Sequence, residues 1–300
     1  IIFSIGKVKK MKRFVLFAIM LALVFLGCSS KKGPDNDLVS IAPHGKVKSI
    51  REMSFSAIDN FGKITPGERR WENPYESTDH YDEFNPEGKM IESSSYGSDG
   101  NLVTKGKMEY DSLGNQVETI WYDSNGKQLL KTTTKFDTNG NGIESIQYLT
   151  DGTRPLKTTR KFNESGNLVE ILNYDGNGNI FGKIVNNFDE SGNVIESTIF
   201  NSIGARESKY NYKYDNVGNK IEANITVEKF AFVAEESGKY TYEYDNGNMV
   251  SECDYGPNGI LELKRTFKYE FDEKGNWIRK TIFINQIPSF IVERELEYYE

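Results

Sequence analysis

A repeat of 26 residues is the feature that most constrains how this chain can fold. Aromatic residues stand four positions before a glycine at eleven places, and the gaps between them alternate between 12 and 14 residues. The order starts near Ile58, which takes the aromatic's place, and loosens after residue 218. The eleven positions are Phe84, Tyr96, Tyr110, Tyr122, Phe136, Tyr148, Phe162, Tyr174, Phe188, Phe200 and Tyr214.

Each aromatic opens a short phrase such as "YDSLGN" (110–115) that has the chemistry of a turn. An Asp or Asn side chain accepts hydrogen bonds from the backbone N–H groups that follow it, and Gly adopts positive φ without steric cost. A type I turn that ends in a left-handed Gly and a bulge is a common hairpin connection. The segments between phrases, such as "QVETIWY" (116–122), are rich in β-branched and aromatic residues and contain no Pro. They are typical of strands.

The sequence therefore predicts an all-β fold, a long antiparallel β-meander of 26-residue double-hairpin repeats. Turns from Ile58 to the end indicate up to about seventeen strands, more than the roughly ten that an open twisted sheet tolerates without curling. We expect the sheet to curl into an open shell or spiral. The segment 33–57 is expected to hold a first strand, and 64–80 replaces one half-repeat with a loop. Residues 214–244 suggest a longer turn.

A glutamate and a lysine recur 13 residues apart in five repeats, as in Glu118 and Lys131. The other pairs are 92 and 105, 144 and 157, 170 and 183, and 196 and 209. A two-residue loop would place each pair directly opposite across two strands, whereas a bulged turn would place the partners on opposite faces. The turn residues favour the bulge and the charge pattern favours the ladder, so both arrangements remain open.

The N-terminal part has the pattern of a lipoprotein signal. Lys12 and Arg13 precede an apolar run from Phe14 to Leu26, which is shorter than the roughly 20 residues that span a bilayer. The end of the run, "FLGC", resembles the bacterial lipobox, although Phe25 replaces the usual Leu. The resemblance implies cleavage before Cys28 and acylation of that cysteine. We expect residues 1–10 to be an upstream extension of the reading frame, 11–27 a signal peptide, 28–45 the lipidated Cys and a polar tether, and 46–300 a single repetitive β-sheet domain.

The phrases "YDSLGN", "FDESGN", "YDNVGN" and "FDEKGN" resemble the YD-repeat superfamily of RHS-type toxins and teneurin-like shells. They are more similar still to bacterial lipoproteins that carry such repeats. The resemblance covers about residues 58–300 and implies a spiral β-sheet that can enclose cargo; some members bind partners or carbohydrate. This chain departs from the pattern in having Asn where the repeats usually carry Arg after the Gly, which puts encapsulation in doubt.

Residues for metal or acid–base chemistry form weak patterns. Asp137, Asn139, Asn141 and Gly142 match the first half of an EF-hand loop, but Tyr148 stands where a bidentate Glu is required. The two histidines, His44 and His80, come without a cysteine cluster, which disfavours zinc. Carboxylates recur with the period and therefore favour structural roles. The chain is predicted not to be an enzyme and to need no cofactor, and Cys253 is expected to be a small buried thiol.

The remaining patterns concern binding. The net charge of −7 disfavours nucleic acid as a partner. Trp71, Trp121 and Trp277, with the tyrosines, could stack on sugars, and the edges of an open sheet could accept a strand from another protein. Glycine triplets near 140–142 and 176–179 lie in turns and do not indicate phosphate loops. The leading hypothesis is a non-catalytic cell-envelope lipoprotein that acts as a scaffold or binding surface, anchored in the outer membrane or at the cell surface. A carbohydrate-binding module is the alternative.

Overall fold

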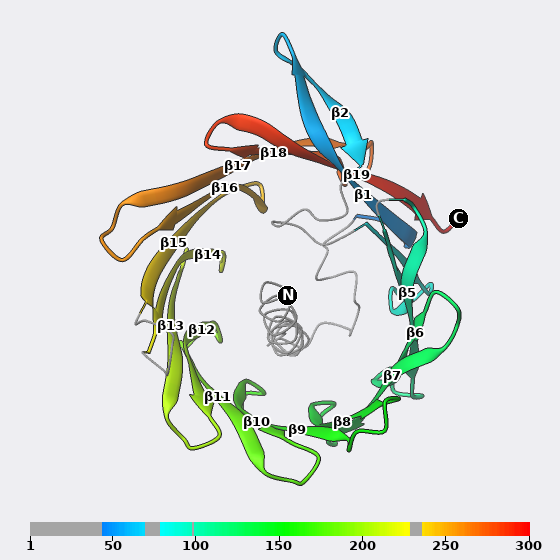
Figure 1. Cartoon of the computed structure of the whole chain (residues 1–300), viewed down its shortest axis with the longest axis vertical. Coiled ribbons are helices and arrows are strands. Elements are labelled where there is room, and N and C mark those ends of the chain that lie inside the picture. The colour runs from blue at the N-terminus through cyan, green and yellow to red at the C-terminus, as the bar shows by residue number, and fades with distance from the viewer. Residues whose placement is uncertain (1–43, 70–78, 98, 229–235) are drawn as a thin grey trace, which may run out of the picture.

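The computed structural model describes residues 44–300, apart from 70–78, 98 and 229–235. These residues form one antiparallel sheet of nineteen strands connected in chain order (Figure 1). The strands are β1 Val47–Asn60, β2 Lys63–Arg69, β3 His80–Phe84, β4 Met90–Tyr96, β5 Leu102–Tyr110, β6 Gln116–Asp123, β7 Gln128–Phe136, β8 Gly142–Leu149, β9 Leu156–Phe162, β10 Leu168–Tyr174, β11 Ile180–Phe188, β12 Val194–Asn201, β13 Arg206–Tyr214, β14 Lys220–Val227, β15 Glu236–Asp245, β16 Asn248–Tyr255, β17 Leu261–Phe271, β18 Trp277–Ile284 and β19 Ile287–Tyr298.

The sheet closes into a barrel. β1 pairs with β19 along its length, from Val47 opposite Tyr298 to Ser56 opposite Phe290, and it also pairs with β3. All strands except β2 therefore form an eighteen-stranded ring (Figure 1). The predicted all-β antiparallel meander is confirmed, but the open shell or spiral is wrong. Closure is favoured because it pairs the backbone groups that two free sheet edges would leave exposed.

The turns have the chemistry that the repeated phrase predicts. The Asp111 N–H donates to the Asn115 carbonyl at 3.0 Å, and the Gly114 N–H donates back to the Asp111 carbonyl at 3.0 Å. The Asp111 carboxylate also accepts the N–H groups of Leu113 and Asn115 at 2.9 and 2.8 Å. Gly114 has a φ of 87°, the left-handed conformation that this turn requires. The same bonds recur at most of the other phrases.

A second bulge decides the geometry of the glutamate–lysine pairs. Between Trp121 and Tyr122 the register shifts by one residue, so that Ile120 lies opposite Lys131. This shift, just beyond the bulged turn, returns Lys131 to the face of Glu118, and the two side chains meet diagonally at 2.5 Å. The predicted ladder is confirmed, since all five pairs make ion pairs of 2.5–3.2 Å. The directly opposite register and the placement on opposite faces are both wrong, because each counted the turn alone and not the strand bulge that follows it.

The buried core is thin and lies mainly where the barrel closes. Val47, Ile50 and Phe84 form one cluster at the junction of β1 with β3, and Leu168, Ile171 and Ile184 form another between β10 and β11. Ile282, Ile291 and Val292, on the last two strands, are also almost fully buried. A wall one strand thick with a wide interior buries its apolar side chains only where neighbouring side chains cover them.

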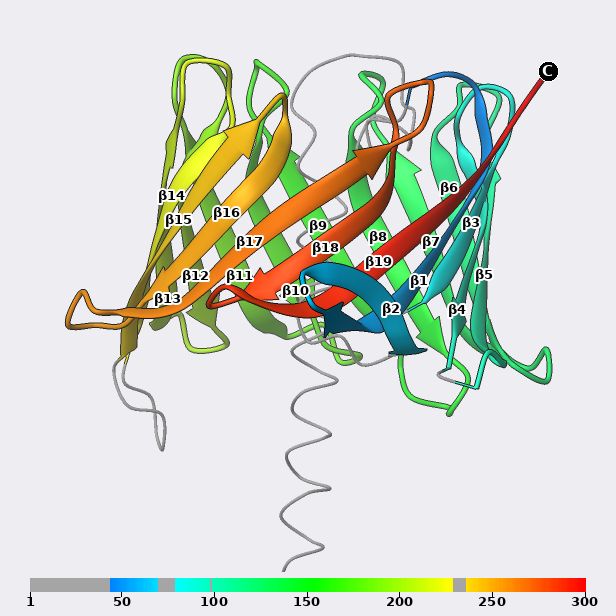
Figure 2. The same cartoon turned by 90° about the horizontal axis from the view of Figure 1, so that it is seen from above.

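One hairpin leaves the ring. The end of β1 turns at Phe61 and Gly62 into β2, which pairs only with β1 (Figures 1 and 2). The expected loop at 64–80 is therefore wrong for Lys63–Arg69, which is a strand, and residues 70–78 lie outside the described residues. The expected first strand is present as β1. The longer turn expected near 214–244 falls largely on residues 229–235, which are not described. Within the described parts of the chain, no helix is long and apolar enough to cross a membrane.

Candidate functional site on the inner wall

The handedness of the chain shows which side chains face outward. Asp272 is hydrogen-bonded to Gly275 and Asn276 across the turn, so its N–H and C=O groups point toward β18. Residues alternate along a strand, so the N–H and C=O groups of Glu270 and Lys268 in β17 point the same way. For L-residues, a side chain that faces the viewer on an upward strand has its N–H and C=O groups on the right. Figure 2 shows β17 from outside, running upward with β18 to its right. Glu270 and Lys268 therefore lie on the outer wall.

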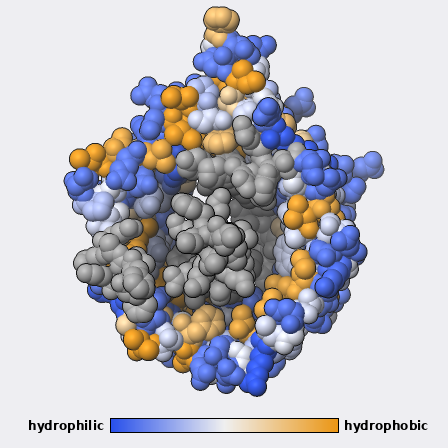
Figure 3. All heavy atoms as spheres, in the orientation of Figure 1, coloured by the Kyte–Doolittle hydropathy of each residue, from blue (hydrophilic) through white to orange (hydrophobic). Residues whose placement is uncertain are grey.

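The outer wall is highly charged. Cross-strand partners share a face, so the lysines and glutamates of the repeat all lie on this side. Glu144 contacts both Lys135 and Lys157, at 2.9 and 3.2 Å. The side chain of Lys135 is 72% exposed, and Figure 3 shows mostly hydrophilic residues along the outside of the ring. This charged outer wall differs from that of a transmembrane barrel, which carries an apolar band on its outer face.

The inner wall carries a concentrated group of aromatic side chains. In β13, β15 and β17 three successive inward positions are aromatic, and we call these nine residues the aromatic sector. Each of the three strands contributes a triplet of aromatic residues, and Figure 1 shows these strands on one side of the ring. The nine residues are Tyr210, Tyr212, Tyr214, Tyr240, Tyr242, Tyr244, Phe267, Tyr269 and Phe271.

The aromatic sector breaks the symmetry of the repeat. The last residue of each triplet is the aromatic of a phrase, which occurs in every unit. The two inward positions before it carry Thr132 and Thr134 in β7, and Thr158 and Arg160 in β9. A functional site is usually asymmetric, whereas residues that recur in every unit maintain the fold. The replacement of small and polar residues by rings therefore marks this part of the wall.

The register sets the spacing within the aromatic sector. Tyr212 and Tyr240 lie opposite Ala223 from its two sides, which places them about 9–10 Å apart, two strand spacings. Ala223 is buried, with an exposed fraction of 4%, and its small side chain leaves room between the rings. The Tyr210 and Tyr212 rings are stacked with centroids 6.3 Å apart and planes 18° apart. The rings of β13 and β15 therefore form two rows on the inner wall, separated by β14.

A half-buried ion pair and three tyrosine hydroxyl groups give this surface its polarity. Arg265 binds Glu252, which lies opposite Tyr242, while Asp254 lies opposite Tyr240. Burial raises the pKa of Tyr242 to about 12, which keeps its hydroxyl a neutral donor. Among the described residues, no hydrogen bond engages the hydroxyls of Tyr240, Tyr242 or Tyr244.

A cavity adjoins the aromatic sector at the β15–β16 turn. Its volume is about 380 Å³, and its lining residues are Asp245, Asn246, Asn248, Val250, Phe267, Lys268, Tyr269 and Phe271. This volume is at the lower end of the range of small-molecule sites. Apolar side chains, a ring with a hydroxyl, two amides and one residue of each charge line it, so it offers both apolar contacts and hydrogen-bond partners.

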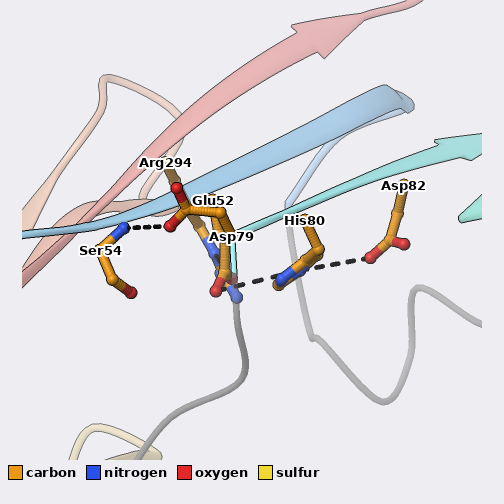
Figure 4. A network of polar contacts seen from close by, with 6 residues as sticks. All are labelled: Glu52, Ser54, Asp79, His80, Asp82 and Arg294. Atoms are coloured by element: carbon orange, nitrogen blue, oxygen red, sulfur yellow. Dashed lines mark hydrogen bonds and ion pairs between the residues drawn. The ribbon is translucent and has the colours of Figure 1, made fainter. Parts of the chain in front are cut away.

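A second polar cluster lies where the barrel closes (Figure 4). Asp79 accepts the Ser54 N–H at 2.6 Å and binds Arg69. Its side chain is 1% exposed. Its bonds tie the residue that precedes β3 to both strands of the β1–β2 hairpin. The positive charge of Arg69 thus balances the negative charge of the Asp79 carboxylate.

The neighbouring carboxylates of this cluster are Glu52 and Asp82. Arg294 donates to Glu52 at 2.6 Å, which connects β19 to β1. His80 Nε2 lies 3.4 Å from Asp82 and 3.9 Å from Glu52 (Figure 4). Burial raises the pKa of Asp82. Convergent carboxylates are the arrangement that would favour an enzyme, but here cations bind two of the three and join the strands of the closure. The cluster is better suited to closing the barrel than to acid–base chemistry.

The candidate metal ligands and the cysteine that the sequence indicated lie in different parts of the fold. Asp137 accepts the Asn139 and Asn141 N–H groups and the Asn141 side-chain amide at 2.8–2.9 Å, which is the turn role that Asp111 also has. No group of three or more potential metal ligands occurs in the described part of the chain. His44 lies at the β17–β18 turn, far in the fold from the cluster of His80, and its N–H donates to the Asn276 side chain at 2.5 Å. Cys253 is a free, half-buried thiol.

Two of the three tryptophans proposed to stack on sugars pack against neighbouring residues of the barrel. The Trp121 ring lies across Gly106, where an added Cβ would sit 2.9 Å from it. Trp277 is covered by the Arg294 guanidinium, 3.5 Å from the ring centroid, and by the edge of Tyr269. Trp71 and Cys28 lie outside the described residues. Sequence reasoning missed the tyrosine triplets, although the spacing of the "YNYKY" and "YTYEY" segments shows that their rings share one face.

Comparison with known proteins gives likeness in architecture alone. No family model and no curated protein matches the chain. A porin-like protein from Bacteroides uniformis is 12% identical, with 85% of this chain and 98% of that chain covered and a TM-score of 0.41. A porin-like protein from Bacteroides vulgatus is 12% identical, with 84% and 98% covered and a TM-score of 0.38. The TcdB2-TccC3 structure is also 12% identical, but only 17% of that chain is covered and the TM-score is 0.27. Membership of the YD-repeat superfamily stays a prediction.

Proposed function

We propose that the protein is a non-catalytic binding protein of the bacterial cell envelope, and that its inner wall is the binding surface. One observation carries this proposal. Within a periodic barrel, the aromatic triplets are confined to β13, β15 and β17, and they face the interior. Barrels of sixteen to eighteen strands are too wide for side chains to fill, so an eighteen-stranded ring leaves room for a ligand.

Carbohydrate is the ligand class that the aromatic sector favours. Sugar rings have apolar faces that pack on aromatic rings, while their hydroxyl groups need hydrogen-bond partners. Tyrosine supplies both a ring and a hydroxyl. The Arg265–Glu252 pair neutralises the charge near Tyr242, which favours an uncharged oligosaccharide over an acidic one. The sector extends over three alternate strands, which suits a chain of several sugar units.

The envelope location rests on the sequence. The basic residues 12 and 13, the apolar run 14–26 and Cys28 together support export and acylation. The acyl chains would hold the barrel at a membrane while its charged outer wall faces water. We therefore retain the lipid anchor on Cys28 and the scaffold or binding role. We assign binding to the inner wall instead of to a free sheet edge.

A glycan array tests the proposal. The chain from residue 33 retains every strand pairing between Val47 and Tyr298 and is the form to apply. We expect it to retain neutral oligosaccharides, and we expect Tyr240→Ala to weaken that binding about tenfold, since each stacked ring contributes about 1 kcal/mol or more. Tyr148→Ala, on the outer wall, is the matched control and should bind as the parent does. Retention of no glycan, or equal losses in both variants, would contradict carbohydrate binding on the inner wall.

A further inference from the structure

Exposed apolar side chains gather at one end of the barrel. Of the seventeen large apolar side chains that are exposed among the described residues, eleven lie at the end of the barrel where β1 and the even-numbered strands of the ring finish and the odd-numbered strands from β5 onward begin. We call this the apolar end. Prominent members are Phe61, Val103, Ile180, Ile203, Ile260 and Ile287, of which Phe61 is fully exposed.

These side chains are spread around the ring rather than gathered in one patch. Val103 lies at the start of β5, Ile180 at the start of β11, Ile203 in the β12–β13 turn and Ile287 at the start of β19. Figure 3 looks onto this end and shows hydrophobic patches at intervals around the ring. Eighteen strands spaced 4.8 Å apart and tilted by about 40° enclose a ring about 35 Å across. An annulus of this width matches a broad, flat surface and not a groove.

The two ends differ in charge. At the opposite end the turns carry ten acidic and two basic side chains; they are 85–89, 111–115, 137–141, 163–167, 189–193, 215–219, 245–248 and 272–276. We call it the acidic end. The described turns at the apolar end carry five acidic and three basic side chains; they are 59–63, 97–101, 123–127, 150–155, 175–179, 201–205, 256–260 and 285–286. A membrane with anionic headgroups would repel the acidic end and accept the apolar end.

The β1–β2 hairpin extends the apolar end beyond the ring. It projects sideways from the barrel wall (Figures 1 and 2), and Phe61 lies in its two-residue turn, between the paired Asn60 and Lys63. Phe61 has a φ of 54°, in the left-handed region that a bulky residue rarely adopts. The two other turns of this kind carry Asn246 and Asn285 at the corresponding position, with φ of 47° and 49°. A strained and fully exposed phenylalanine is costly to the fold alone, so its retention points to a contact outside the chain.

We propose that the apolar end docks on a lipid surface, with Phe61 and the turn residues inserted among the headgroups. Tyr148 and Leu149 are adjacent, as are Ile260 and Leu261, but the other described members are single side chains spread around the ring. This distribution differs from the contiguous area of roughly 800 Å² per partner that a stable protein interface buries. A bilayer needs no such continuity, because lipids adjust around each side chain. The seventeen residues from Cys28 to His44 reach about 55 Å when extended, which is longer than a strand. The tether therefore allows either end to face the membrane.

Vesicle binding tests this inference without any glycan, so its outcome is separate from that of the inner wall. The probe is the unlipidated chain from residue 33 with vesicles of phosphatidylethanolamine and a minor share of phosphatidylglycerol. We expect the parent to co-sediment, with little dependence on salt. The triple variant Phe61→Asn, Ile260→Asn, Ile287→Asn should lower its partition coefficient at least about tenfold.

Leu113→Asn with Val217→Asn is the matched control, because both side chains are 76–85% exposed in turns of the acidic end. We expect this control to bind as the parent does, and circular dichroism should show the same sheet content in all three proteins. Three results would overturn the inference: a parent that does not co-sediment, a control that loses binding as strongly as the triple variant, or binding that salt abolishes while the triple variant retains it. In the last case, charge and not the apolar end would hold the protein to the vesicle.

Discussion

Arg265 and Glu252 form a two-point ion pair on the inner wall, with Nε donating to Oε2 and the terminal NH2 group contacting Oε1, both at 2.8 Å. The two side chains are only 12% and 19% exposed, whereas the outer-wall Lys135 is 72% exposed. The two residues lie opposite each other on β16 and β17, on the same face of the sheet as the aromatic sector. This position makes the pair a structural support of the surface to which we assign binding.

Arg265→Ala is expected to destabilise the barrel by about 3 kcal/mol, because it leaves Glu252 charged, mostly buried and without its partner. Urea unfolding of the variant and the parent measures the loss. The double variant Arg265→Leu, Glu252→Leu removes both charges and should recover most of the stability. If the double variant is as unstable as the single one, the cost lies in packing and not in the unpaired charge.

Glu222 is expected to make the stability depend on pH in the acid range. Hydrogen bonds from Lys213, Lys239 and Asn224 lower its pKa from 4.5 to about 2. A carboxyl whose pKa is lower in the folded state contributes stability that is fully present above pH 4.5 and is lost as the pH falls toward 2. The variant Glu222→Gln should therefore be less stable than the parent at pH 7, and the difference should shrink between pH 4.5 and 2. Urea midpoints measured at several pH values check this, and a constant difference would contradict it.

The repeat made the strands and turns predictable because both depend on neighbouring residues. The Asp111–Gly114 turn and the strands on either side of it follow from the phrase alone. Closure could not be predicted in the same way, since the pairing of Val47 with Tyr298 joins the two ends of the domain and depends on the curvature summed over all strands. The glutamate–lysine geometry failed for a related reason. A single bulge after the turn reverses every later face, and no residue of the phrase marks it.

The inner wall could not be identified from the sequence, because the two aromatics of each repeat face opposite sides of the sheet. The first aromatic of each unit, such as Tyr110, faces inward, while the second, such as Tyr122, lies opposite Lys105 on the outer wall. The sequence therefore shows rings on both faces and does not identify an interior. The triplet at 240–244 was visible as a pattern, but its meaning required the barrel to define which face is enclosed.

Ile291 is expected to be essential for closure. Its side chain is fully buried in β19, opposite Phe55 of β1, so Ile291→Ala should cost about 2–4 kcal/mol through the cavity that it leaves. Val217→Ala, in an exposed turn, should change stability by less than about 0.5 kcal/mol. Thermal unfolding of both variants provides the comparison. Similar midpoints would show that the β1–β19 seam does not limit the stability of the barrel.

Tyr242 is expected to act as a neutral hydrogen-bond donor in the binding of carbohydrate. Its pKa is raised to about 12 by burial, so the hydroxyl keeps its proton at any pH below about 11. Affinity for an oligosaccharide should therefore stay constant between pH 7 and 10.5, and calorimetry measures it. Tyr242→Phe should weaken binding about fivefold by removing one hydrogen bond, and Tyr242→Ala should weaken it further by removing the ring. Equal affinities of the Phe variant and the parent would mean that the hydroxyl does not contact the ligand.

Phe61→Asn is expected to stabilise the β1–β2 hairpin by about 1 kcal/mol, because asparagine tolerates the left-handed conformation better than phenylalanine does. The hairpin has only two strands beyond the ring and can open without unfolding the barrel. Hydrogen exchange of the amides of β2 is therefore the appropriate measurement, and exchange should slow about fivefold. The reciprocal variant Asn246→Phe should destabilise the β15–β16 turn by a similar amount. If exchange in β2 is unchanged by Phe61→Asn while Asn246→Phe behaves as expected, then Phe61 is not strained, and the argument from its conformation to an outside contact fails.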